Sequence, residues 1–139
     1  MIRAVPDTNI VVSAHLEADG AEALILGLAL GGLFRCFVSE ELFQEYSEVL
    51  RRPKFGFEKE QIEKLLRGMR KATRMVKPKK KLKLTRDPDD NHVLECALEA
   101  RAEYVVTGNL RHFPKQYQDI RVVAPKAFLM VLAAQPGGL

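Results

Sequence analysis

Short apolar runs alternate with amphipathic segments along the 139 residues of the chain, and this alternation predicts strands separated by helices. The predicted strands cover residues 2–6 (IRAVP), 34–39 (FRCFVS), 103–109 (EYVVTGN) and 120–125 (IRVVAP). The predicted helices cover residues 21–30, 40–52, 59–76, 87–102 and 126–134. Such alternation indicates an α/β fold of three layers, in which helices flank a central, mostly parallel sheet on both faces.

The chain carries no repeat and no linker, so we expect one domain over residues 1–134 and a frayed tail over residues 135–139. No apolar run reaches the roughly 20 residues of a membrane helix, and no signal peptide begins the chain, which favours a cytoplasmic protein without a membrane contact. The two cysteines, Cys36 and Cys96, are expected to be buried thiols rather than a disulfide.

The net charge of +4 hides a strong asymmetry. Residues 51–86 contain 15 of the 22 basic residues and three of the 18 acids, a net charge of +12, so the remainder carries −8. A basic arm on an acidic body favours nucleic acid or another polyanion, because phosphate contacts release counterions. A solvated helix face followed by a loop is the alternative explanation of the same charges.

Acidic residues occupy three positions that point towards the expected core. Asp7 follows the first strand, although a loop aspartate in an Asx-turn would serve as well. Glu45 lies at the edge of the apolar stripe of its helix, where it points inward or extends into solvent. In the run DPDD, Asp87 suits a helix N-cap, but Asp90 lies three and four residues before Val93 and Leu94, on the core side.

These three acids would meet in one crevice if the strand ends and helix starts converge, because sites in parallel sheets collect at the carboxyl ends of strands. Crowded carboxylates raise one another's pKa, and a divalent cation relieves the repulsion. Oxygen ligands without a histidine or cysteine cluster favour Mg²⁺ or Mn²⁺.

The order of these segments resembles that of the PIN domain family. The matching segments are a strand followed by DTN, VSEELFQEYSEVLRRPKF, DPDDNHVLECALEA and YVVTGNLRHF, and together they cover residues 2 to about 132. In particular, the chain resembles the VapC-like and related toxin components of bacterial and archaeal toxin–antitoxin pairs. It implies a single nuclease domain, a metal-dependent endoribonuclease with Mg²⁺ or Mn²⁺ as cofactor, an RNA substrate, a small antitoxin partner and a homodimer.

The resemblance also implies roles for individual residues. The catalytic acids would be Asp7, Glu45 and Asp90, and the metal ligands Asp7, Asp90, Glu45, Asp87 and Asn109. Asn109 stands where the family often has Asp, which leaves a second metal in question. Supporting hydrogen bonds would come from Thr8, Asn9 and Thr107, and contacts to the RNA backbone from Lys77, Lys79, Lys80, Lys81, Lys83 and Arg86.

Two other functions remain open at this point. A non-catalytic RNA-binding module with a weakened metal site would also explain Asn109 and the basic arm. An aspartate-nucleophile phosphatase or a receiver domain would also place an Asp after the first strand, but the phosphatase needs a second Asp where Asn9 stands, and a receiver needs an Asp where Ser39 ends the next strand.

Overall fold

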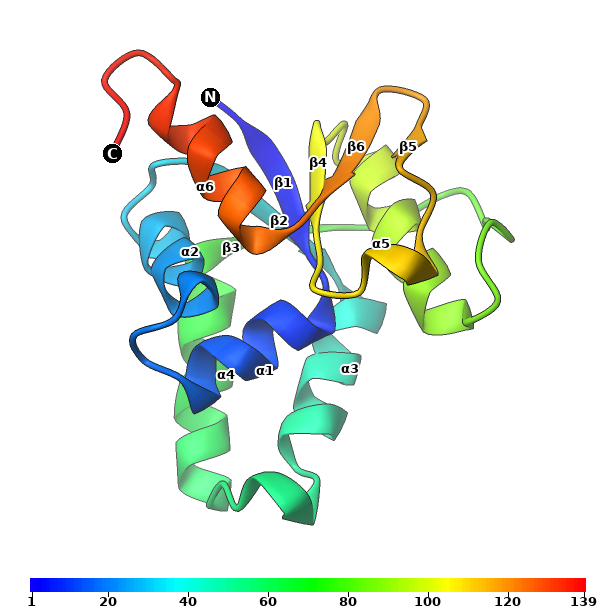
Figure 1. The fold of residues 1–139 in the computed structure, drawn as a ribbon. Coiled ribbons are helices and arrows are strands. Elements are labelled where there is room, and N and C mark those ends of the chain that lie inside the picture. Colours follow the sequence, from blue (N-terminus) through cyan, green and yellow to red (C-terminus); the bar gives the residue numbers. More distant parts are fainter.

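The computed structural model describes all 139 residues, and it contains one six-stranded sheet and six α-helices (Figure 1). The strands are β1 (Arg3–Pro6), β2 (Arg35–Ser39), β3 (Thr73–Val76), β4 (Tyr104–Val106), β5 (Gln116–Tyr117) and β6 (Ile120–Val123). The α-helices are α1 (Thr8–Leu16), α2 (Ala21–Leu30), α3 (Glu40–Leu50), α4 (Lys59–Ala72), α5 (Pro88–Glu99) and α6 (Pro125–Ala133). Two short 3₁₀ helices are η1 (Pro53–Phe55) and η2 (Leu110–His112). The expected α/β fold is confirmed.

The sheet has the strand order β3-β2-β1-β4-β6-β5, and every pair is parallel except β5 with β6. The chain builds outward from β1 to β2 and β3 on one side, and then returns to place β4 on the other side of β1. The direction of winding therefore reverses between β1 and β4. In open α/β sheets, ligands bind in the crevice outside the carboxyl ends of the strands at such a reversal.

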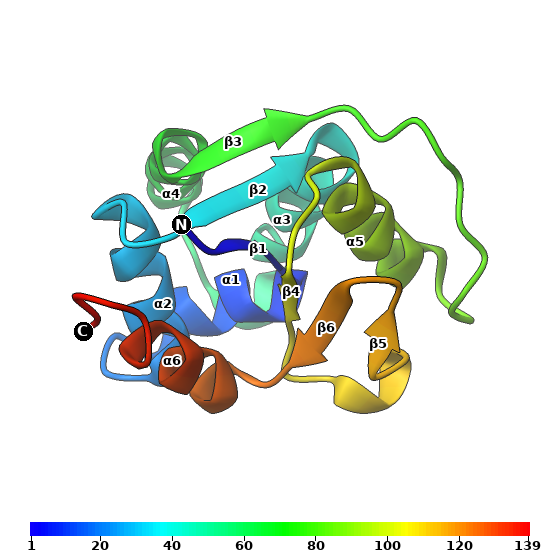
Figure 2. The ribbon, with the colours of Figure 1, turned by 90° about the horizontal axis from the view of Figure 1, so that it is seen from above.

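Helices cover both faces of the sheet (Figure 2). Alternate side chains of each strand point to opposite faces, so Val5 joins the cluster that includes α3 and α5, while Ala4 joins the cluster of α2 and α6. Phe128 of α6 is fully buried in the second cluster, edge-on to Phe34. Helices α1, α3 and α4 extend beyond the carboxyl ends of β1 and β2 as a lower lobe (Figure 1). The crevice beside β1 therefore has walls made of helices.

Three elements differ from the sequence-based expectation. Helix α1 was not expected, because its residues are buried on most sides and no amphipathic repeat marks it. The helix expected over residues 59–76 ends at Ala72, because the following four residues pair with β2 as strand β3. Strand β5 has two residues and was not expected.

Local signals set the ends of three helices, and the expected N-cap at Asp87 and the expected buried cysteines are confirmed. The Ser39 hydroxyl accepts a hydrogen bond from the Leu42 amide and caps α3, and Asp87 caps α5 by accepting from the Asp89 amide. Helix α2 ends at the Gly31–Gly32 pair, where Gly32 has a φ of 75° that suits glycine. Both cysteines are free and buried, and burial raises the pKa of the Cys36 thiol to about 12.

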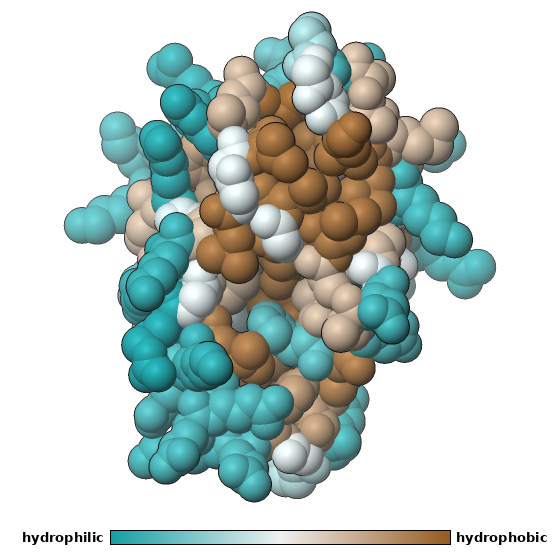
Figure 3. Space-filling model, turned by 90° about the vertical axis from the view of Figure 1, so that its left-hand side faces the viewer, coloured by the Kyte–Doolittle hydropathy of each residue, from teal (hydrophilic) through white to brown (hydrophobic).

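In the view of Figure 3, an apolar area occupies the upper part of the molecule, on the side where α2 and α6 lie, with hydrophilic residues to its left and below it. Its exposed or half-exposed members, called here the α2–α6 face, are Leu24, Leu28, Leu30 and Met130. None of the helices combines the length and the apolar character that a membrane crossing requires.

The tail after α6 lies beside the first residues of the chain, and Met1 and Leu139 line one cavity there. Its expected fraying stays a prediction.

Tyr46 links α3 to the end of β1, because its fully buried hydroxyl donates a hydrogen bond to the Pro6 carbonyl oxygen at 3.0 Å. We expect Tyr46→Phe to lower the free energy of unfolding by about 1–2 kcal/mol and the Tm by about 3–8 °C, since a buried acceptor loses its donor. Tyr104→Phe removes the same hydroxyl from a half-buried ring packed against Phe128, and it serves as the control in thermal unfolding. Equal Tm values for the two variants would contradict the expectation.

A candidate metal centre at the carboxyl edge of the sheet

Asp7 lies at the point where β1 ends and α1 begins, and it is 6% exposed. One carboxylate oxygen accepts a hydrogen bond from the Thr8 amide at 2.7 Å, and the other accepts from the Thr107 hydroxyl at 2.8 Å. Burial raises the pKa of Asp7, although these two hydrogen bonds act in the opposite direction. Asp7 is therefore a helix N-cap that is held in place from β4, across the reversal in strand order.

Glu45 projects from α3 towards the same place and is half-buried. The Thr8 hydroxyl donates a hydrogen bond to its carboxylate, so Thr8 contacts both acids, through its amide and through its side chain. Burial raises the pKa of Glu45 to about 7, and repulsion from the carboxylates of Asp89 and Asp7 adds to the rise. At neutral pH this carboxyl exists in both protonation states.

The two acids at the start of α5 have different surroundings. The Asp87 side chain caps the helix, with Pro88 in the first turn. Asp90 is 9% exposed and turns inward, so the capping explanation holds for Asp87 and not for Asp90. Burial raises the pKa of Asp90 to about 6, followed by repulsion from Asp7 and Asp87. His112 lies with its Nδ1 atom 3.5 Å from the Asp90 carboxylate and lowers this pKa.

All five residues expected to hold a metal line one cavity of about 470 Å³: Asp7, Glu45, Asp87, Asp90 and Asn109. The supporting residues expected from the sequence lie beside them. Thr8 and Asn9 line the same cavity, and the buried Thr107 hydroxyl also accepts a hydrogen bond from the Asn109 amide at 3.0 Å. The side-chain oxygen Oδ1 of Asn9 accepts a hydrogen bond from the Gly108 backbone amide at 3.4 Å, so Asn9 links α1 to the segment after β4.

The donor set of this cavity fits a divalent cation that prefers oxygen. Four carboxyl groups and one amide line the cavity, and three of the carboxyl groups have a raised pKa. The ion pairs of the protein include none between these acids and a lysine or arginine. No three His, Cys, Asp or Glu side chains already surround one common point, since Glu45 bonds to Thr8 and Asp90 lies against His112. Binding a cation here therefore requires side-chain rotation.

The sequence reasoning missed several residues around this cavity. His112 contacts Asp90 from η2, while Arg52, Lys54 and Phe55 form the opposite rim beside Glu45. Both groups belong to segments that resemble the PIN domain family, RRPKF and NLRHF. No residue pattern in these segments indicated that their side chains face the acids. Their position depends on how α3 and β4 are placed in the fold.

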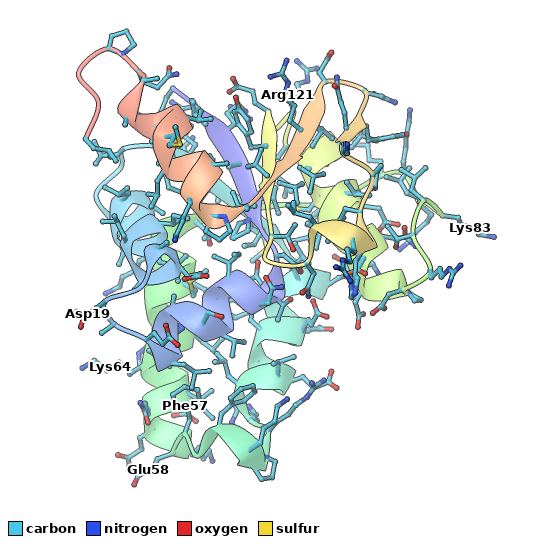
Figure 4. All side chains as sticks on the ribbon, in the orientation of Figure 1. Asp19, Phe57, Glu58, Lys64, Lys83 and Arg121 are labelled. Atoms are coloured by element: carbon cyan, nitrogen blue, oxygen red, sulfur yellow. The ribbon has the colours of Figure 1, made fainter.

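The lysine-rich segment lies along the outer side of α5. Its backbone is held there by carboxylates of the helix, with the Leu82 amide donating to Glu95 at 2.8 Å and the Lys79 amide donating to Glu99 at 3.1 Å. Figure 4 shows Lys83 pointing away from the molecule. The lysines of this segment line neither cavity that contains Asp90; Arg86 lines the second of them, about 640 Å³ in volume, together with Arg111 and His112.

Three comparisons relate the chain to known proteins. A family model described as the PIN domain matches residues 3–111. The crystal structure of VapBC2 from Rickettsia felis, bound to a DNA fragment from its promoter, contains a chain with a similar fold. The TM-score is 0.63 at 16% sequence identity, and the match covers 88% of this chain and 98% of that one. Among curated proteins, none matches the sequence.

Proposed function

This chain belongs to the PIN domain family, and from that membership and its acidic cavity we propose that it is a metal-dependent endoribonuclease that acts as the toxin of a toxin–antitoxin pair. One observation carries the proposal. Asp7, Glu45 and Asp90 come from three separate parts of the chain, yet they line one cavity in which none of them forms an ion pair with a lysine or an arginine. Burial of unpaired carboxylates is costly, and a bound cation removes that cost.

The cation would be Mg²⁺ or Mn²⁺, held by Asp7, Asp90 and Asp87 with Glu45 and Asn109 at the margin. When bound, such an ion polarises a phosphodiester and lowers the pKa of a water molecule. Glu45 lines the same cavity, where it would orient the attacking water and accept its proton. The Thr8 hydroxyl orients that carboxylate, and Thr107 holds Asp7 in one rotamer.

The proposed substrate is RNA, because basic side chains surround the acids without filling the cavity. Arg52 and Lys54 lie on one rim, while Arg86 and Arg111 line the adjoining cavity beside Asp90. The lysines of residues 77–83 are assigned to the backbone of a longer RNA that extends past the cavities onto α5, through charge and without base readout.

Incubation of the purified protein with labelled single-stranded and structured RNAs tests the proposal. Cleavage is expected with Mn²⁺ or Mg²⁺ and is expected to stop with EDTA. Cleavage that persists at the same rate in EDTA would contradict a metal-dependent mechanism.

The second candidate function is a non-catalytic RNA-binding module. Asn109 favours it, because an amide is a weaker ligand than a carboxylate and the acids do not already surround one point. This function predicts that calorimetry detects no binding of millimolar Mn²⁺, while affinity for RNA is retained and falls with salt. Saturable Mn²⁺ binding would exclude it.

Thr107 positions Asp7 and has no other proposed role in the reaction. We expect Thr107→Val to lower the cleavage rate by about 10- to 100-fold, the cost that follows from losing a hydrogen bond to a metal ligand. Thr107→Ser keeps the hydroxyl and is expected to stay near the wild-type rate. Equal loss in both variants would show that the methyl group, rather than the hydrogen bond, is needed.

The proposed partners are a small antitoxin and a second copy of this chain. The α2–α6 face supports the homodimer, because α2 is apolar on nearly all sides and a helix of that kind is normally covered. The exposed members of the face are apolar, and Gly27 leaves open space for close approach of a second helix. A single monomer mass in sedimentation at tens of micromolar protein would contradict the homodimer.

A further inference from the structure

The segment between α3 and α4 forms a small aromatic and basic rim, called here the η1 rim, made of Arg52, Lys54, Phe55 and Phe57. Helix α3 ends at Leu50, Pro53 starts the 3₁₀ helix η1, and Gly56 follows it with a φ of 66°. That left-handed backbone turns the chain back towards α4 and suits glycine. The rim is therefore a defined turn on the lower lobe of the molecule.

Two rings build the apolar part of this rim. Phe55 and Phe57 lie nearly parallel, with centroids 6.2 Å apart and an angle of 28° between their planes. Both are half-buried and pack against the small core cluster of Val12, Leu50 and Ile62. Only Phe55 also lines the cavity that contains Asp7 and Glu45, whereas Phe57, which is labelled in Figure 4 and precedes the start of α4, does not. One partly exposed aromatic ring is thus held firmly beside the acids.

The charges of the η1 rim are free to bind an anion. Arg52 and Lys54 are exposed, line the same cavity, and take part in none of the ion pairs of the protein. The Lys54 ammonium lies over the Phe55 ring, 5.0 Å from its centroid, so a base can stack on that face only when the lysine moves aside to a phosphate. A flat ring and two cations at one edge of an acidic cavity match the two parts of a nucleotide, its base and its phosphate.

We propose that the η1 rim is a nucleotide subsite, where Phe55 stacks on the base next to the cleaved phosphodiester and Arg52 and Lys54 bind the neighbouring phosphates. This inference rests on the proposed function, because it takes RNA as the substrate. Stacking on an aromatic ring needs an unpaired base, so the rim selects single-stranded RNA over a duplex at this position. It discriminates little between the four bases, since every base has a π-face.

A purely structural role of Phe55 in the small cluster is the alternative, and it predicts effects on stability without effects on binding. Binding is therefore measured in EDTA, with a short single-stranded RNA that carries 2-aminopurine, so that no cleavage is needed. Phe55→Leu is expected to weaken the affinity by about 5- to 100-fold, the range for loss of one stacked base, and to abolish the fluorescence quenching. Phe55→Tyr keeps a ring and is expected to bind like the wild type.

Phe57→Leu is the matched control for the ring, because it removes the stacked neighbour that does not line the cavity. For the charges, Arg52→Ala and Lys54→Ala are each expected to reduce the slope of log affinity against log salt by about 0.7. Lys64→Ala removes the same charge from the outer side of α4, where Figure 4 shows the side chain pointing away, and it is expected to leave the slope unchanged.

The outcomes separate this inference from the proposed function. Equal RNA affinity and quenching in Phe55→Leu and Phe57→Leu would overturn the subsite, even if the protein cleaves RNA. Quenching lost only in Phe55→Leu, in a protein that cleaves nothing with Mn²⁺, would support the subsite and overturn the nuclease. Equal affinity for a duplex and a single strand would also overturn the subsite.

Discussion

Asp90→Asn is expected to lower the rate of RNA cleavage by about a thousandfold or more. The substitution keeps the shape of the side chain and removes the charge that would hold a cation beside Asp7. Charge stabilisation by a bound metal contributes several kcal/mol to a transition state, and about 4 kcal/mol corresponds to a thousandfold. Asp7→Asn should act in the same way, because Asp7 lies in the same cavity and is more deeply buried.

Asp119→Asn is the matched control for this prediction. Asp119 carries the same charge, but it lies in the turn between β5 and β6, is exposed and lines neither cavity that contains Asp90. We expect this variant to keep its rate within several-fold of the wild type in initial-rate measurements with saturating Mn²⁺. Similar rates for Asp119→Asn and Asp90→Asn would show that the loss does not depend on a position in the cavity, and the assignment of Asp90 would fail.

Amphipathic periodicity predicted the elements that cover one face of the core. Helices α3 and α4 carry a clear apolar stripe, and both were predicted from it. Helix α1 carries none, because Ile10, Val11 and Val12 are all buried, and three β-branched or apolar residues in a row also suit a strand or a turn. Strand β3 follows α4 without a break in composition, so only its pairing with β2 reveals it.

The acids could be predicted because the ends of strands and the starts of helices can be recognised in the sequence. Asp7 follows the first strand, and Asp90 lies in the first turn of a helix. The rims of the cavity could not, since Arg52, Phe55 and His112 approach the acids only through the packing of α3 and η2. The density of basic residues along the chain was also an incomplete guide to which of them lie near the acids. The most lysine-rich segment lies along α5, whereas the arginines nearest the acids are scattered along the chain.

The acidic cavity should also make the metal-free protein less stable as the pH rises. The folded protein raises the pKa of Glu45 to about 7 and of Asp90 to about 6, above the ordinary values of 4.5 and 3.8. Between about pH 4 and pH 7, the folded state therefore binds more protons than the unfolded state. The free energy of unfolding then falls as the pH increases through this range.

Because of this pH dependence, we expect the order of thermal stability of the wild type and Asp90→Asn to reverse when metal is added. A site with a purely structural role would not show this reversal. Without metal at pH 8, Asp90→Asn is expected to melt at a higher temperature than the wild type, because one repelling charge is gone. With Mn²⁺ at about 100 times its Kd, the wild type gains about 2.7 kcal/mol, a Tm increase on the order of 10 °C, and becomes the more stable of the two. Thermal unfolding at pH 5 and pH 8, with EDTA or Mn²⁺, measures all four states. If Asp90→Asn is less stable than the wild type in EDTA at pH 8, the carboxylates are not crowded, and the electrostatic basis for a metal at this edge of the sheet is lost.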